Sequence, residues 1–329
     1  MKIPQVSIII PVYNAGGRLV KCLDTLMQQT LRDIEFILVI DCPTDGSDKI
    51  AQAYAEKDNR ITLIYNTENL HIGKSRNRGL EVARGEYIGF SDHDDYRELD
   101  MYEQMYDYAQ NKHADIVISR PAVKREGCIE LWHVPDIEVS QFKEYALMDL
   151  MGRGNGERDV SVFCNIHNVI YRRDLIMSNH IQFVDTRFIA PEDVLFNIET
   201  ILCADTVVYL NRPFYYHLML ESSEGHSSSY SGWEKRGEGM NYLYQLLRQK
   251  HVFELYASSF YNQVTKQFLN SLLGVLYQGQ SMKNFWKAYR ILKSYSFTKP
   301  AFKQYKPDVT PRSWLKNKVR ALFALLLTH

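Results

Sequence analysis

The sequence predicts an α/β protein built on a doubly wound, mostly parallel sheet, with a helical extension at its C-terminal end. Three observations support this fold class. Continuous apolar runs, typical of buried parallel strands, recur in the first hundred residues. Segments of roughly ten to fifteen residues with helical character separate these runs. An acidic cluster directly follows one of the runs, at the place where an open α/β sheet binds its ligand.

Strands and helices are expected to alternate over the first hundred residues. The first strand is the β-branched run Val6-Ser7-Ile8-Ile9-Ile10, which Pro11 ends. The helix that follows carries Leu19, Leu23 and Leu26 on one face, as a helix that covers a sheet requires. Further strands are predicted at 35–40, 61–65 and 87–90, and the helices of this part at 15–29, 48–57 and 73–83.

The second part of the chain is predicted to be less regular. A helix and a strand are expected within 100–119, a glycine-rich loop at 152–156, a short helix at 171–177 and a strand at 207–210. A longer helix begins at Pro191, because proline suits a first helical turn, with Glu192 and Asp193 beside it. After a Ser/Gly-rich loop or boundary at 221–232, residues 233–296 read as helical, and a short amphipathic helix follows Pro311.

Charge is distributed unevenly along a chain of zero net charge. Residues 235–329 contain 16 Lys+Arg and 3 Asp+Glu, a balance of +13, so the preceding residues carry −13. Such asymmetry indicates an anionic partner, which could be nucleic acid, a membrane surface or a charged substrate. No apolar run reaches about 18 residues, the length that indicates a membrane-spanning helix. The five cysteines are scattered and lack metal-site spacing, which favours reduced thiols in a cytoplasmic protein.

The acidic cluster Asp92-His93-Asp94-Asp95 follows the predicted strand at 87–90. Carboxylates this close repel one another unless they are solvated or a divalent cation neutralises them. Mg²⁺ or Mn²⁺ held by one or two carboxylates keeps its other positions for water and phosphate. The cluster therefore suggests a metal–diphosphate site. The alternative is a solvated turn and helix cap, which is the more common role of an acidic loop.

Polar and aromatic residues also follow the first two strands. Tyr13 lies at the end of the first strand, where its ring could stack on a nucleobase. Asp41 lies at the end of the second, where its carboxylate could accept a hydrogen bond from a base. The alternatives are a rim aromatic for Tyr13 and turn or helix-capping carboxylates for Asp41 and Asp45.

In combination these segments resemble the family-2 glycosyltransferases, nucleotide-sugar-dependent enzymes with the GT-A fold. The resembling stretches are VSIIIPVYN (6–14), EFILVIDCPTDGS (35–47), ENLHIGKSRNRGLEVARGEYIGFSDHDD (68–95) and PEDVLF (191–196). The resemblance covers roughly residues 4–230. The family usually has two acidic residues where Ile40-Asp41 stand and glycine-serine where Cys42-Pro43 stand. His93 replaces a residue that is usually small.

The resemblance implies roles for individual residues. Asp94 of the DXD motif would ligate Mn²⁺ or Mg²⁺, and Asp92 would contact the ribose or a metal-bound water. Asp95 would cap the following helix. Arg76 would lie near the nucleotide or its phosphates, and Asp193 would be the general base. The residues expected to line the nucleobase are Pro11, Tyr13 and Asp41. The expected late metal ligand is His226, with His217 as the alternative, and His71 and His167 could also reach the crevice.

The resemblance also implies a function. The expected activity is metal-dependent, inverting transfer of a sugar from a nucleotide sugar, with a UDP-sugar as the favoured donor. The expected acceptor is a saccharide or lipid-linked saccharide in cell-envelope polysaccharide, lipopolysaccharide or capsule synthesis. The two alternatives are a binding scaffold on the same fold that has lost turnover, and a nucleotidyltransferase. The latter normally has a Gly-rich, basic loop after the first strand, of which 11–18 holds only a fragment.

Three regions are expected along the chain. Residues 1–100 form the nucleotide-sugar-binding half of the GT-A domain, residues 101–232 the acceptor-binding and catalytic half, and residues 233–329 a basic helical region. The basic region is expected to contact anionic lipid at the inner face of the cytoplasmic membrane, as a peripheral contact of a cytoplasmic protein. Nucleic acid is not an expected partner, because no nucleic-acid motif accompanies the charge.

Overall fold

The protein was analysed as a computed structural model that describes residues 3–93, 96–125, 128–131, 134, 137–151, 163–218, 232–277 and 281–304. The chain divides into two compact units. The first comprises Met1–Leu150, Val160–Thr186 and Glu192–Glu221. The second comprises Met151–Asp159, Arg187–Pro191 and Ser222–His329. Both predicted halves of the GT-A domain contribute strands to the sheet of the first unit.

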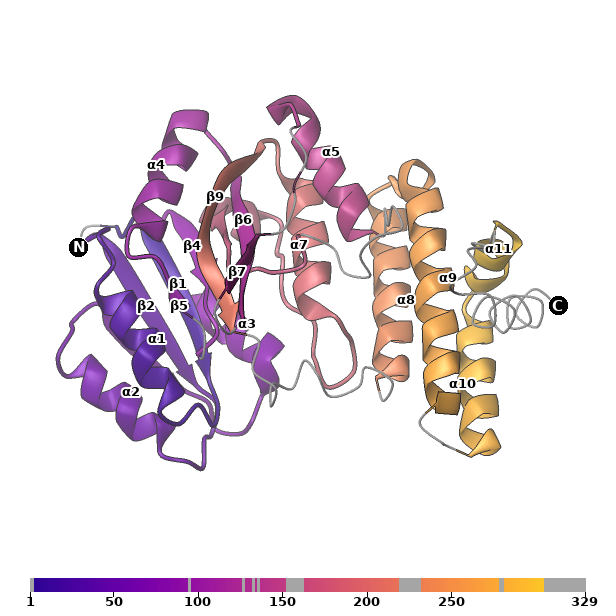
Figure 1. The fold of residues 1–329 in the computed structure, drawn as a ribbon, viewed down its shortest axis with the longest axis horizontal. Coiled ribbons are helices and arrows are strands. Elements are labelled where there is room, and N and C mark those ends of the chain that lie inside the picture. The colour runs from indigo at the N-terminus through magenta and orange to yellow at the C-terminus, as the bar shows by residue number, and fades with distance from the viewer. Residues whose placement is uncertain are drawn as a thin grey trace. The chain divides into compact units, whose positions relative to one another are not determined.

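The first unit is built on one sheet with the strand order β3-β2-β1-β4-β8-β6-β9-β5, and β7 pairs with β6. Strand β1 pairs in parallel with β2 and β4, and β2 pairs in parallel with β3. Strand β6 is parallel to β9. Strand β8 runs antiparallel between β4 and β6. The strands (Figure 1) are β1 (Val6–Val12), β2 (Ile34–Ile40), β3 (Ile61–Tyr65), β4 (Tyr87–Phe90), β5 (Tyr96–Arg97), β6 (Ile116–Arg125), β7 (Cys128–Leu131), β8 (Val169–Arg172) and β9 (Val207–Leu218).

Helices cover both faces of this sheet, which confirms the predicted α/β class. Ile8 and Ile10 of β1 belong to the core that includes the buried face of α1, whereas Ile9 points to α3. At Gly79 of α3 a Cβ atom would lie 2.4 Å from Ile9 Cγ2, so the helix packs directly on the strand. Strands covered on both faces are apolar throughout, which explains the continuous runs of β1 and β2. The helices of this unit are α1 (Arg18–Met27), α2 (Ser47–Ala55), α3 (His71–Val82), α4 (Met101–Lys112), α5 (Val139–Leu150), α6 (Arg173–Ser178) and α7 (Glu192–Cys203).

The strand order identifies the edge where a ligand is expected. The chain places β2 and β3 on one side of β1 and then returns to place β4 on the other side. In open α/β sheets such a reversal marks the ligand site, at the carboxyl ends of the strands on either side of it. Tyr13 follows β1 and Asp92 follows β4, so both residues belong to this edge.

Two predicted elements differ in the structure. The helix predicted at 171–177 is wrong at its start, because Tyr171 lies in β8 and α6 begins at Arg173. The buried run Val169–Arg172 fills the gap between β4 and β6, a tertiary requirement that local periodicity does not express. The strand predicted at 207–210 is longer and continues to Leu218 as β9. The helix predicted from Pro191 is present as α7 and begins one residue later.

The second unit is helical, as predicted for 233–296. Its helices are α8 (Trp233–Gln249), α9 (Phe253–Tyr277), α10 (Met282–Ser294) and α11 (Thr298–Gln304). Aromatic rings join them, and Phe260 of α9 contacts Tyr244 of α8 and Phe297 before α11. The loops predicted at 152–156 and, apart from residue 232, at 221–232, and the helix predicted after Pro311, lie outside the described residues. Within the described part of the chain, no helix combines the length and apolar character needed to cross a bilayer.

Candidate active site

The candidate site lies in the first unit and is centred on Arg76 of α3. Two contacts fix the helix at this point. The side-chain amide of Asn77 donates to the carbonyl oxygen of Phe183 at 2.9 Å and accepts from its backbone N–H at 2.8 Å. At Gly73 a Cβ atom would lie 2.3 Å from the carbonyl oxygen of Val184, so only glycine permits this approach. The neighbouring side chain of Arg76 is consequently held in the interior, with 1% of its surface exposed.

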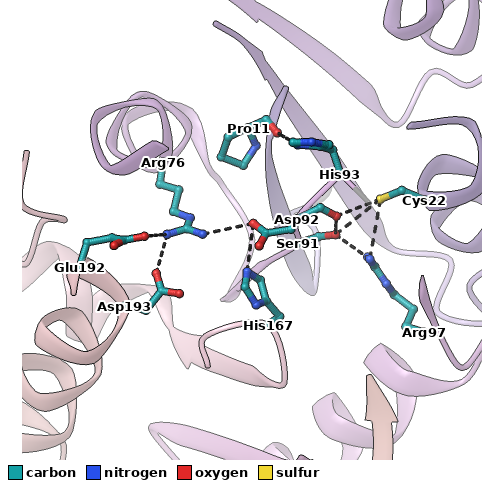
Figure 2. Close-up of polar contacts among 10 residues, drawn as sticks. All are labelled: Pro11, Cys22, Arg76, Ser91, Asp92, His93, Arg97, His167, Glu192 and Asp193. Carbon is teal, nitrogen blue, oxygen red and sulfur yellow. Dashed lines mark hydrogen bonds and ion pairs between the residues drawn. The ribbon is translucent and has the colours of Figure 1, made fainter. Parts of the chain in front are cut away.

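Three carboxylates converge on the guanidinium of Arg76 (Figure 2). Its Nη1 donates to Asp193 Oδ1 at 2.6 Å and to Glu192 Oε1 at 3.1 Å. Its Nη2 donates to Asp92 Oδ1 at 3.2 Å. Burial disfavours a charged guanidinium, but the attraction of the three carboxylates outweighs it and raises the pKa of Arg76. The side chain therefore acts as a permanent buried cation, and its face also lies over the Phe183 ring at 5.2 Å.

Asp92 has a second basic partner. His167 Nε2 lies 3.1 Å from the same oxygen, Asp92 Oδ1, that accepts from Arg76. Burial alone raises the pKa of a carboxyl, but the charges of His167 and Arg76 lower the pKa of Asp92 far below its usual range. In turn Asp92 raises the pKa of His167 against the effect of burial. The imidazole is stacked on Tyr215 at a centroid distance of 5.3 Å, which fixes the plane of the ring.

Glu192 and Asp193 occupy the first turn of α7, where the helix dipole favours negative charge. Burial of Glu192, together with the charge of the neighbouring Asp193, raises the pKa of Glu192 to about 7, although Arg76 opposes the shift. Glu192 and Asp193 therefore share the cation Arg76 but lie in different local surroundings. The sequence points to this pair through the acidic residues after Pro191, but it does not show that both side chains reach the same nitrogen of Arg76.

Side chains from α1, β5 and the acidic loop itself hold the backbone around Asp92 in place. Arg97 Nη2 donates to Ser91 Oγ at 2.6 Å, and the Cys22 thiol donates to the carbonyl oxygen of Asp92 at 3.2 Å (Figure 2). His93 Nδ1 lies 3.3 Å from the carbonyl oxygen of Pro11, which joins the end of β4 to β1. These contacts hold the start of the acidic loop at the ligand edge of the sheet.

The residues predicted for a nucleobase lie at the same edge. Tyr13 is 45% exposed, whereas Pro11 is buried within β1. Asp41 is buried, and its Oδ1 accepts from Asn66 Nδ2 at 2.8 Å and from the backbone N–H of Leu70 at 2.7 Å. Asp41 therefore anchors the segment that leads into α3, and its contact with a base stays a prediction.

The alternative role given to Asp45 is confirmed. Its Oδ1 accepts from the backbone N–H of Ser47, the first residue of α2, at 3.1 Å. Its Oδ2 accepts from the backbone N–H of Gly16 at 2.7 Å. This carboxylate caps a helix and ties two loops together.

Several residues predicted for the metal site and the helix cap beside it fall outside what the structure describes. Asp94, Asp95 and His226 lie outside the described residues, and His217 is described only as part of β9. No group of three or more His, Cys, Asp or Glu side chains able to hold a metal ion occurs among the residues that are described. Asp92 Oδ1 already pairs with Arg76 and His167, so a cation site of the kind that takes one or two carboxylates and leaves its other positions to water and phosphate stays a prediction. In such a site Asp94 would supply the second carboxylate.

Comparison with known proteins places the chain in a family. A profile of the family described as "Glycosyl transferase family 2" matches residues 7–178, more than half of the chain. The chain belongs to glycosyl transferase family 2. This family-2 chain is 34% identical over 224 residues to the putative glycosyltransferase EpsH of Bacillus subtilis, covering 68% of the chain and 63% of EpsH. It is 31% identical over 258 residues to the cholesterol galactosyltransferase of Borreliella burgdorferi, covering 76% and 69%. The chain thus spans less than two thirds of the length of EpsH.

Solved glycosyltransferases share the fold of this family-2 chain. Staphylococcus aureus TarS residues 1–349, in complex with UDP-GlcNAc, match with a TM-score of 0.69 at 20% identity, over 98% of this chain and 89% of TarS 1–349. The mannosyltransferase PcManGT of Pyrobaculum calidifontis, in complex with GDP-Man and Mn²⁺, matches with a TM-score of 0.54 at 16% identity, over 100% and 88%. At these identities the likeness concerns the fold, and the predicted GT-A fold is confirmed.

Proposed function

We propose that the protein is an inverting glycosyltransferase that moves a sugar from a nucleotide sugar to a saccharide acceptor. The observation that carries the proposal is the meeting of Asp92, Arg76 and Asp193 at one edge of the sheet. These residues come from segments far apart in the chain, yet one buried guanidinium contacts all three carboxylates of the cluster. A scaffold requires no such concentration of charge, whereas transfer from a diphosphate requires both a proton acceptor and positive charge.

In the proposed reaction Asp193 accepts the proton of the acceptor hydroxyl. The acceptor oxygen forms a bond to the anomeric carbon as the bond from that carbon to the diphosphate oxygen breaks. The bonding electrons leave with the nucleoside diphosphate, and a single displacement inverts the anomeric centre. Arg76 contributes fixed positive charge beside the leaving group. A divalent cation, when bound, stabilises the charge that develops on the diphosphate, and Asp94, Asp92 and His226 or His217 are the residues proposed to hold it.

The comparisons support a nucleotide-sugar donor and a cell-envelope acceptor. TarS is described in complex with UDP-GlcNAc, and PcManGT with GDP-Man and Mn²⁺. A relative from Bacillus spizizenii, 30% identical over 234 residues, is a poly(ribitol-phosphate) beta-glucosyltransferase. We therefore propose a UDP-sugar donor, Mn²⁺ or Mg²⁺ as the cation, and an acceptor in cell-envelope polysaccharide synthesis.

A peripheral contact with anionic lipid, on the inner face of the cytoplasmic membrane, belongs to the same proposal. The described part of the basic region offers one surface for it. Residues 281–304 contain six Lys+Arg and no Asp or Glu. Helix α10 within this stretch exposes Lys283 and Arg290 together with 57% of Met282 and 43% of Trp286. Basic and amphipathic side chains on one helix are typical of interfacial membrane contact.

The experiment that tests the function combines donor binding with turnover. We expect one of UDP-GlcNAc, UDP-glucose, UDP-galactose and GDP-mannose, with Mn²⁺, to raise the melting temperature, because a ligand that binds the native state stabilises it. We expect the same donor to release its nucleoside diphosphate, and Asp193→Asn to slow that release by about 10²- to 10⁴-fold while it still binds donor. The control is Asp174→Asn on α6, whose side chain is 83% exposed. Donor binding without turnover in the wild type supports the scaffold instead, and formation of sugar 1-phosphate and a nucleoside triphosphate from the donor and added pyrophosphate supports a nucleotidyltransferase.

A further inference from the structure

The pair Glu192 and Asp193 contains one more carboxylate than the proposed reaction uses. Asp193 alone can accept the proton of the acceptor, yet Glu192 is also held inside the site. Both side chains accept a hydrogen bond from the same atom, Arg76 Nη1, at 3.1 and 2.6 Å (Figure 2). A nitrogen with two N–H bonds can serve two acceptors, so the position of Arg76 depends on both carboxylates.

We propose that Glu192 is a positioning residue for the base. By binding the same nitrogen as Asp193, it holds Arg76 in place and shares a cation that would otherwise act on Asp193 alone. This inference rests on the proposed function, and it assigns to Glu192 the role of setting the position and charge environment of the proton acceptor, Asp193.

The charges around the pair define the effect. Arg76 Nη1 donates to Glu192 and to Asp193, so its positive charge is shared between the two carboxylates, and a neutral side chain in place of Glu192 would leave the cation paired with Asp193 alone on that nitrogen. Removing the charge of Glu192 therefore leaves a weaker base. Among the described residues, the charged and titratable groups that face the pair include Arg76 of α3, Asp92 after β4, His167 before β8 and Tyr171 of β8, whose pKa is raised by burial and by the charge of Asp193. Cys164 also faces the pair, and burial and the charge of Asp193 raise its pKa to about 12.

The first test uses the donor-free, full-length protein and follows its melting temperature from pH 5 to pH 8. Glu192 has a folded-state pKa above its ordinary value, so its stabilising contribution is complete below about pH 4.5 and is lost as the pH rises through about 7. Relative to Glu192→Gln, the wild type should lose roughly 5 °C over this range. Its relative loss should shrink in Asp193→Asn, where the neighbouring charge is absent. His167 titrates alike in the wild type and in Glu192→Gln, so the difference between these two isolates Glu192, whereas Asp193→Asn also removes a charge that raises the pKa of His167.

The second test follows the pH dependence of turnover with the donor chosen by the thermal-shift panel. Glu192→Gln should move the acid-side midpoint of kcat to lower pH by about one unit and lower the plateau about tenfold, because its base is weaker. Glu192→Asp, which keeps the charge, should retain the wild-type midpoint. A purely structural glutamate would change the melting temperature or KM and leave the midpoint in place.

The outcomes separate the two proposals. If the wild type consumes no donor at any pH, the proposed function fails, and the melting curves still decide whether Glu192 and Asp193 are coupled. If the wild type turns over and Glu192→Gln keeps both its midpoint and its plateau, the role of Glu192 is overturned while the function stands. Equal pH dependence of stability in the wild type and Asp193→Asn also overturns it.

Discussion

At the scale of single residues, the main feature of the site is that three partly buried carboxylates share one fully buried guanidinium. Asp92, Glu192 and Asp193 surround one guanidinium, and His167 supplies a second partner for Asp92 alone. Removing one partner of a buried ion pair destabilises the folded state by more than the pair stabilises it. The reason is that the remaining charge is left unpaired where water solvates it poorly. The stability of the first unit should therefore depend on Arg76 far more than on an exposed arginine.

We predict that Arg76→Met destabilises the protein by about 3–5 kcal/mol at pH 8. The deficit should shrink toward pH 5, because Glu192, whose pKa is raised to about 7 even while Arg76 opposes the shift, takes up a proton as the pH falls and one of the stranded charges disappears. Denaturant unfolding at the two pH values measures both effects. The control is Arg78→Met on the same helix, where an exposed pair with Glu81 at 2.6 Å contributes about 1 kcal/mol or less. Equal losses for the two variants would contradict the assignment of Arg76 as the centre of the cluster.

Individual members of this cluster could be predicted from the sequence, but their arrangement could not. The acidic residues after the strand at 87–90 and after Pro191 lie at recognisable places, and the resemblance to the family points to Arg76. His167 is one of the histidines that could reach the crevice, but no spacing or neighbouring residue in the sequence selects it, and only the fold brings it to Asp92. The bond between Arg76 and Asp193 joins residues 117 positions apart, a relationship that local patterns do not contain.

At the scale of elements, the site depends on how closely α3 approaches the chain at 183–186. The approach uses the absence of a side chain at Gly73 and the paired hydrogen bonds of Asn77 with Phe183. Arg76 lies between these two positions. A displacement of the helix therefore changes the distances between the guanidinium and its carboxylates, although no residue of the cluster is altered.

We predict that Gly73→Ala destabilises the protein by about 1–3 kcal/mol, the usual cost of overpacking, and slows donor turnover. An added methyl group would meet the backbone oxygen of Val184, which cannot move aside like the end of a flexible side chain. Thermal unfolding and the release of nucleoside diphosphate measure the two effects. Gly17→Ala is the matched control, because nothing lies within 4 Å of its added atom and its backbone is already right-handed helical. A loss at Gly17 as large as that at Gly73 would contradict the role of close packing.

The sequence predicts a helix or strand correctly where one local pattern is enough to identify it. The parallel strands β1, β2 and β4 are buried along their whole length, so largely apolar runs mark them clearly in the sequence. Strand β8 is short, and a run such as Val169–Arg172 fits a helix start or a strand equally well. Its neighbours β4 and β6 on either side settle the choice, and those lie about 50 to 80 residues away in the chain.

At the scale of the whole molecule, the separation of charge along the chain is the main property that no single element explains. The acidic excess belongs to residues 1–234 and the basic excess to residues 235–329. Within the described part of the basic region, α10 combines exposed cations with exposed Met282 and Trp286. Attraction to an anionic surface then acts on the basic region and repulsion on the rest, which favours contact through that region.

We predict that the protein sediments with vesicles of phosphatidylglycerol and phosphatidylcholine but not with vesicles of phosphatidylcholine alone. Binding should weaken as salt is added, because exposed charges are screened beyond about 10 Å at 0.1 M. Lys283→Glu with Arg290→Glu should weaken binding at least tenfold, since each cation near such a surface contributes about 1 kcal/mol. The matched control reverses two exposed cations of the first unit, Lys21→Glu with Lys57→Glu, which should leave binding unchanged or slightly weaker.

A deletion distinguishes the two possible sources of this binding. Removing residues 312–329 eliminates four of the basic residues and the apolar C-terminal run while α10 is retained. If both surfaces contribute, the deletion and the α10 double variant should each weaken vesicle binding and should spare turnover on a soluble acceptor, because both leave the residues of the cluster around Arg76 unaltered. Equal sedimentation with anionic and neutral vesicles would refute a charge-driven membrane contact. Loss of binding in the deletion alone would assign it to the C-terminal segment and exclude α10, which bears the exposed tryptophan.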